Sequence, residues 1–140
     1  MMHLSRFLLL TIIIGLTGLL LWAQKDRTDY RSLYVYAEKL YNDKNPTNQK
    51  DSAALAAYKK IISLLSRSRI NDSVLWDSYF KAAIFEQTYN HYEQAIPLLR
   101  ECVNLQRSQL NIPRPSGFLP NLYLGNSYYI INRFDSARYY

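Results

Sequence analysis

The sequence predicts an all-α protein, a right-handed superhelical stack of antiparallel helix hairpins. Three observations support this. Apolar residues recur with the 3.6-residue period of helices along most of the chain. Only 4 of the 140 residues are glycine and 5 are proline, which argues against a turn-rich β-sandwich. An alanine also recurs near the start of every second helix, at Ala54, Ala95 and Ala137, 41 and 42 residues apart.

The first predicted hairpin covers residues 28–66. Thr28 or Asp29 can cap a helix that continues to about Tyr41. Residues 42–50 are polar, contain a proline, and indicate a loop. Asp51 or Ser52 then caps a second helix. Its apolar residues share one face: Ala54, Ala57, Tyr58, Ile61, Ile62 and Leu65.

The middle hairpin covers residues 73–108. Its first helix has two apolar stripes, which predicts packing on two sides. One stripe holds Trp76, Tyr79, Phe80 and Ala83, and the other holds Ala82, Phe85 and Tyr89. Asn90-His91 forms a tight turn. The next helix contains Pro97 near its start and turns these residues inward: Tyr92, Ala95, Ile96, Leu99, Cys102 and Val103.

The last hairpin covers residues 118–140 and follows a loop at 107–117. Pro120 falls in the first turn of its first helix, where proline is tolerated. Asn132-Arg133 turns the chain, and Asp135 or Ser136 caps a sixth helix. That helix stops at Tyr140 without the polar capping helix that closes natural arrays. The stack therefore looks truncated, and we expect self-association through its open C-terminal end.

Residues 124–140 closely resemble a tetratricopeptide repeat (TPR). Leu124 and Gly125 match the Leu-Gly pair of the repeat's first helix, Tyr128 matches its tyrosine, and Ala137 matches the alanine of the second helix. The middle hairpin places other residues at the repeat's defining positions: Tyr79, Ala83, Ala95 and Cys102. Its Glu86 stands where an aromatic residue is usual. The period of about 42 exceeds the usual 34 and resembles longer-loop repeats of exported bacterial proteins.

The resemblance implies a scaffold that binds a protein or peptide on its concave face. The residues expected to line that groove are Phe80, Ile84, Gln87, Leu122, Asn126, Tyr129 and Ile130. They suit an extended or helical apolar peptide, although some of them can instead pack against further repeats. The basic clamp with which chaperone-binding TPR domains hold a C-terminal carboxylate is not reproduced, since Leu119, Leu122 and Tyr123 occupy its positions.

An alternative function follows from the same resemblance. Exported TPR arrays often form the sensory N-terminal region of a larger signalling protein. The output domain would then lie beyond residue 140, as a histidine kinase, a DNA-binding domain or a caspase-like CHAT protease.

Residues 1–23 predict an export signal. Arg6 supplies a positive charge, an apolar run extends from Phe7 to Leu21, and Ala23 offers a cleavage position before Gln24. Because the run is short for a membrane span, cleavage is the first interpretation and an uncleaved anchor is the alternative. The mature part, residues 24–140, is then periplasmic or otherwise outside the cytoplasm. Contact with a membrane would come only from an uncleaved N-terminus or a downstream helix.

Other classes of function find little support in the sequence. The net charge of +6 is spread along the chain, unlike the clustered basic stripe of nucleic-acid-binding proteins. The residues that carry catalytic chemistry elsewhere have simpler interpretations. We expect Cys102 to be inert core, His91 a solvated turn residue, and Glu86, Glu93 and Glu101 solvated helix-face residues. The sequence thus predicts no enzyme, metal site or cofactor.

Overall fold

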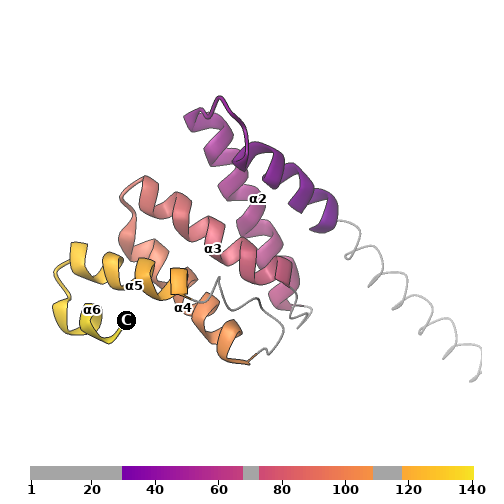
Figure 1. Cartoon of the computed structure of the whole chain (residues 1–140). Helices are drawn as coiled ribbons and strands as arrows, with labels where there is room; N and C mark the ends of the chain where they lie inside the picture. Colours follow the sequence, from indigo (N-terminus) through magenta and orange to yellow (C-terminus); the bar gives the residue numbers. More distant parts are fainter. Residues whose placement is uncertain (1–29, 68–72, 109–117) are drawn as a thin grey trace, which may run out of the picture. The chain divides into compact units, whose positions relative to one another are not determined.

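A computed structural model describes residues 30–67, 73–108 and 118–140, and all its regular elements are helices (Figure 1). Residues 30–41 are helical, and five labelled helices follow: α2 (Asn48–Arg67), α3 (Ser73–Thr88), α4 (Tyr92–Ser108), α5 (Phe118–Ile130) and α6 (Phe134–Tyr139). The all-α prediction is therefore confirmed. The predicted export signal and the loop at 109–117 lie outside the described residues.

Each of these helices packs mainly on its neighbours in the sequence (Figure 1). From Leu33 onward the chain forms one compact unit. The inward face of α2 is buried as predicted, except that Ile62 is half-buried. In α3, Trp76 and Ala83 are buried on one side, while Ala82 and Phe85 are buried on the other. The prediction that this helix packs on two sides is confirmed.

The main apolar core joins α3, α4 and α5. Leu99 and Leu124 are fully buried at its centre. The small residues that define the predicted repeat have the expected role, since Ala54, Ala83 and Ala95 have no exposed surface. Tyr128 is also buried, and its ring stacks on Tyr140 of the last residue at 5.9 Å between centroids.

Two hairpin turns have the same geometry at positions 42 residues apart. Asn90 ends α3 with a φ of 62°, and Asn132 ends α5 with a φ of 60°. The N–H of His91 donates to the carbonyl of Glu86 at 2.7 Å, as that of Arg133 donates to the carbonyl of Tyr128 at 2.8 Å. This bond from the second residue after the helix back to its last turn is the Schellman motif. The repeat therefore extends to the backbone of the turns.

Two helix starts differ from the prediction. The helix α2 begins at Asn48 rather than after Asp51 or Ser52. The Thr47 hydroxyl accepts a hydrogen bond from the N–H of Lys50 at 3.2 Å and so caps the helix three residues earlier.

The helix α6 begins at Phe134, and the residue before it makes no side-chain cap. The carbonyl of Arg133 already accepts the N–H of Ala137 at 3.0 Å, so the helix follows directly from the turn. Asp135 is therefore in the first turn of α6 rather than at its cap.

Candidate functional site

Helix α5 has one buried side and one open side. Pro120, Leu124, Ser127 and Tyr128 face the core. The other side carries a row of exposed apolar side chains: Phe118, Leu119, Leu122, Tyr129 and Ile130. Leu122 is 51% exposed and Tyr129 is 63% exposed. Large apolar side chains gathered on one helix face are the usual mark of a surface that binds another protein.

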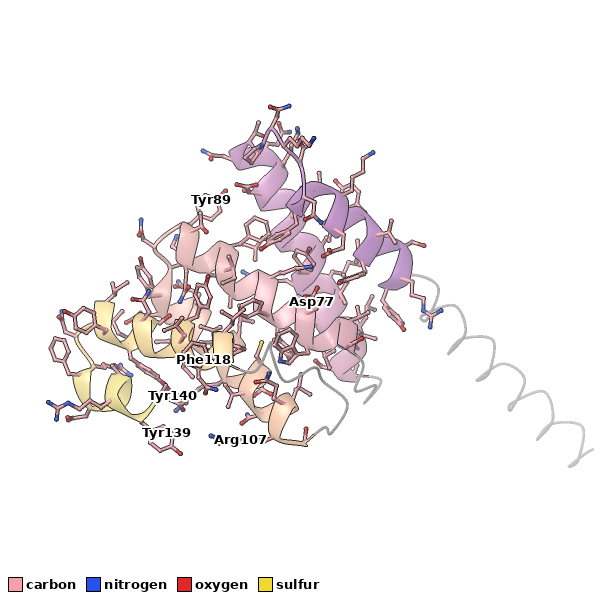
Figure 2. All side chains as sticks on the ribbon, viewed as in Figure 1. Asp77, Tyr89, Arg107, Phe118, Tyr139 and Tyr140 are labelled. Atoms are coloured by element: carbon pink, nitrogen blue, oxygen red, sulfur yellow. The ribbon has the colours of Figure 1, made fainter. Side chains whose placement is uncertain are left out.

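A pocket of about 610 Å³ lies between this open side of α5 and the short helix α6. Three of its walls are aromatic rings, and Arg138 contributes a positive charge. The lining residues are Asn121, Leu122, Gly125, Asn126, Tyr129, Phe134, Ala137, Arg138 and Tyr140. The two rings at the chain end, Tyr139 and Tyr140, lie beside one another at the edge of α6 (Figure 2).

Small residues give this pocket its depth. A Cβ added at Gly125 would lie 3.5 Å from the carbonyl oxygen of Ala137 and 3.7 Å from Tyr140. These are ordinary van der Waals distances, so α6 lies against the bare backbone of α5 without needing the glycine. The larger side chains at Leu122, Tyr129 and Phe134 stand around this floor.

The predicted groove residues fall into two sets. Leu122, Asn126 and Tyr129 all line the pocket, and Ile130 is exposed on the same helix. Phe80 and Gln87 lie on α3 and are instead held by α5. The Phe80 ring meets the Tyr123 ring edge-on at 5.7 Å. The structure therefore does not bring all seven residues to one open surface.

The side-chain amide of Gln87 donates to the carbonyl of Tyr123 at 2.9 Å and to the hydroxyl of Ser127 at 2.5 Å. Ile84, on the same helix face between Phe80 and Gln87, is half-buried. This face of α3 is thus part of an interface between hairpins. The alternative that some predicted groove residues pack against a neighbouring repeat applies to Phe80 and Gln87.

Glu86 is not on a solvated face, contrary to the prediction. It is only 3% exposed, and its carboxylate contacts Lys59 of α2 and the Nδ1 of His91 at 2.9 Å. Burial raises the pKa of Glu86, but the hydrogen bonds from Lys59 and His91 outweigh it and leave the pKa below its usual range. Helical periodicity could not reveal this, because the Lys59 partner comes from another helix.

The other candidate catalytic residues behave as predicted. Glu93 and Glu101 are exposed. Cys102 is fully buried, and its thiol donates to the carbonyl of Trp76 at 3.6 Å. Burial raises the pKa of this thiol well above its usual range, so it stays protonated and is a poor nucleophile.

A second polar cluster lies where residues 33–41 meet α2 and α3. Lys81 bridges the carboxylates of Glu38 and Asp77, the latter at 2.8 Å. Tyr34 donates to Asp77 and Tyr58 donates to Glu38, each at 2.6 Å. Burial and then the hydrogen bond to Glu38 raise the pKa of Tyr58. Since every acidic group has a partner, the cluster joins the helices and offers no free acid or base.

The described residues provide no metal site, because nowhere among them do three or more His, Cys, Asp or Glu side chains gather suitably. None of the described helices has the length and apolar character required to cross a membrane. Comparison with known proteins finds no match, whether to a family model, a curated protein or a solved structure. The candidate site therefore rests on this chain's own residues, and its strongest feature is the open face of α5 with the pocket beside α6.

Proposed function

We propose that the chain is a protein-binding scaffold of the tetratricopeptide type. The observation that carries this proposal is the open face of α5, where five large apolar side chains are exposed beside a pocket of about 610 Å³. Burying exposed apolar surface against a partner is the main source of free energy in protein association. The partner surface is an apolar helix or extended segment that places a side chain in the pocket.

The repeated geometry supports the tetratricopeptide assignment. The turns at Asn90 and Asn132 are equivalent and 42 residues apart, and the second follows the Leu124-Gly125 pair. Stacked hairpins present a rigid surface, so a ligand meets side chains that are already in place. The rigid polar cluster around Lys81 and the buried carboxylate of Glu86 contribute to this order.

Selection from a library of random peptides tests the proposal. Peptides that bind the wild-type chain should be rich in apolar and aromatic residues and should lose at least tenfold in affinity for Tyr129→Asp. The tyrosine is largely exposed, so its replacement leaves the fold intact. Ser63→Asp adds the same charge at an exposed position of α2 and should bind as the wild type does. Equal binding to Tyr129→Asp would show that the ligand lies elsewhere.

We also propose that the scaffold acts outside the cytoplasm, because residues 1–23 have the charge and apolar pattern of an export signal. Intact mass measurement of protein from the periplasmic fraction tests this. The expected product begins at Gln24. Full-length protein found only in the cytoplasmic fraction would contradict it.

A further inference from the structure

The two interfaces between successive hairpins use equivalent positions. In the later one, Phe80 and Gln87 of α3 receive Tyr123 and Ser127 of α5. We call the Phe80 side of such an interface the receiving face and the Tyr123 side the delivering face.

The earlier interface repeats this arrangement. Tyr34 and Tyr41, each 46 residues before Phe80 and Gln87, receive α3. The Tyr34 hydroxyl donates to Asp77, and the Tyr41 ring meets the Phe85 ring at 5.6 Å. Phe85 in turn stands 42 residues before Ser127. Two successive contacts therefore follow one register.

That register continues onto α5, where the receiving face is open. Leu122 and Tyr129 stand 42 residues after Phe80 and Gln87, and both are more than half exposed. Between them, Asn126 corresponds to Ile84 of α3. The pocket beside α6 is thus the counterpart of the surface on which α5 itself rests.

The helix at residues 30–41 has an open delivering face in the same register. Val35, Tyr36 and Lys39 stand 46 residues before Lys81, Ala82 and Phe85, which α3 presents in its own interface. Val35 is 69% exposed and Tyr36 is 49% exposed. One chain therefore carries both an unoccupied receiving face and an unoccupied delivering face.

We propose that the open face of α5 binds the helix at residues 30–41 of a second copy of this chain, with Tyr36 in the pocket. This inference rests on the proposed function, since it names the partner of the same site. The position of Tyr36 corresponds to Leu124 of α5, which is fully buried against α3 and α4. A side chain at this position of a docked helix therefore enters the space between α5 and α6.

The chemistry of the two faces is complementary. Arg138 of the pocket stands 42 residues after the buried Ile96, so the arriving side chain meets a cation where α5 meets an aliphatic group. An aromatic ring with a hydroxyl suits that position, because a guanidinium stacks on such rings. Lys39, in the position of Phe85, reaches the Tyr129 ring, much as Lys81 lies 5.1 Å from the centre of the Tyr41 ring.

The proposed contact joins two different faces, so each copy keeps one face of each kind free. Such a head-to-tail contact extends into open chains of copies instead of closing in a dimer. Because each copy carries a net charge of +6, raising the salt concentration should strengthen the association by screening the repulsion.

Directional photo-cross-linking tests the proposal in the full chain. One ¹⁵N-labelled copy carries the photoreactive residue p-benzoylphenylalanine in place of Tyr36, together with Tyr129→Asp, so that it can deliver but not receive. It is mixed with unlabelled wild-type chain, irradiated and digested. Mass spectrometry should find label-to-light cross-links to the peptides that contain Leu122, Tyr129 or Arg138.

A matched mixture sets the contrast. Moving Tyr129→Asp to the unlabelled copy should reduce those cross-links at least tenfold, whereas Ser63→Asp in the same copy should not change them. Cross-links that stay within one copy, reach other helices or ignore Tyr129→Asp would overturn the inference. If the selected peptides still bind the α5 face, the proposed function stands without the second copy; if they do not, both proposals fall.

Discussion

Glu86 places a carboxylate inside the α3–α4 hairpin, where Lys59 and His91 contact it. Its repeat counterpart, 42 residues later, is the buried Tyr128. A charge in this position is stable only while its partners are present, because an unpaired buried charge is costly. At the scale of single residues, such exchanges of an aromatic ring for an ion pair distinguish one hairpin from the next.

Stability at low pH should depend on Glu86. Its folded pKa lies below the usual 4.5, so the ionised group contributes stability above that pH and loses it as the pH falls through the folded pKa. Glu86→Gln should lower the unfolding temperature at pH 7, and the difference from wild type should shrink below about pH 4.5. Thermal unfolding followed by circular dichroism measures this. Glu93→Gln, at an exposed position, should change little; a difference independent of pH would contradict the assignment.

Lys81 should be the most sensitive residue of the polar cluster. Lys81→Met leaves the carboxylates of Glu38 and Asp77 without their shared cation, and we expect a loss of about 3 kcal/mol in the free energy of unfolding. Urea unfolding measures the loss. Lys60→Met, at an exposed position of α2, should cost less than about 0.5 kcal/mol. Equal effects of the two substitutions would show that the cluster does not hold the helices together.

Among the elements, the turns at Asn90 and Asn132 fix how each helix pair is joined. Both asparagines have the left-handed backbone conformation that ends a helix and lets the next one start at once. The pattern of apolar residues predicted both turns, because a tight turn had to separate two periodic segments. It did not predict where α2 and α6 begin, since a threonine cap in one case and a backbone bond in the other replaced the expected caps.

Asn90→Ala should destabilise the chain by about 1 kcal/mol, because alanine is strained at a φ of 62°. Asn90→Gly removes that strain and should be neutral or slightly stabilising. Chemical unfolding of the two variants side by side provides the comparison. Alanine and glycine variants of equal stability would mean that the turn relaxes to another conformation.

Gly125→Ala should stabilise α5 by up to about 1 kcal/mol, because glycine inside a helix costs conformational entropy. An added Cβ would meet its neighbours at 3.5 Å or more, so no clash offsets the gain. Alanine is also what α3 has at the equivalent Ala83. Thermal unfolding decides the sign, and a lower unfolding temperature would indicate that α6 packs more closely on α5 than described.

For the whole molecule, the account describes a row of hairpins whose last open face is on α5. Sequence periodicity was enough to predict the helices, the all-α class and the buried alanines. The site was only partly predictable: Leu122, Asn126 and Tyr129 line the pocket, but Phe80 and Gln87 lie inside an interface. Equivalent repeat positions look alike in sequence, and only the arrangement of helices shows which of them a neighbour already covers.

The most direct test of the proposed binding face is to map a bound peptide by NMR. A library-selected peptide is added to the ¹⁵N-labelled chain, and amide shifts are followed along the described helices. We expect the largest changes at Gly125, Tyr129, Ala137 and Arg138, with α2 unaffected. Shifts concentrated on α2 or α4, or none at saturating peptide, would contradict the account that the open face of α5 is where this protein binds its partner.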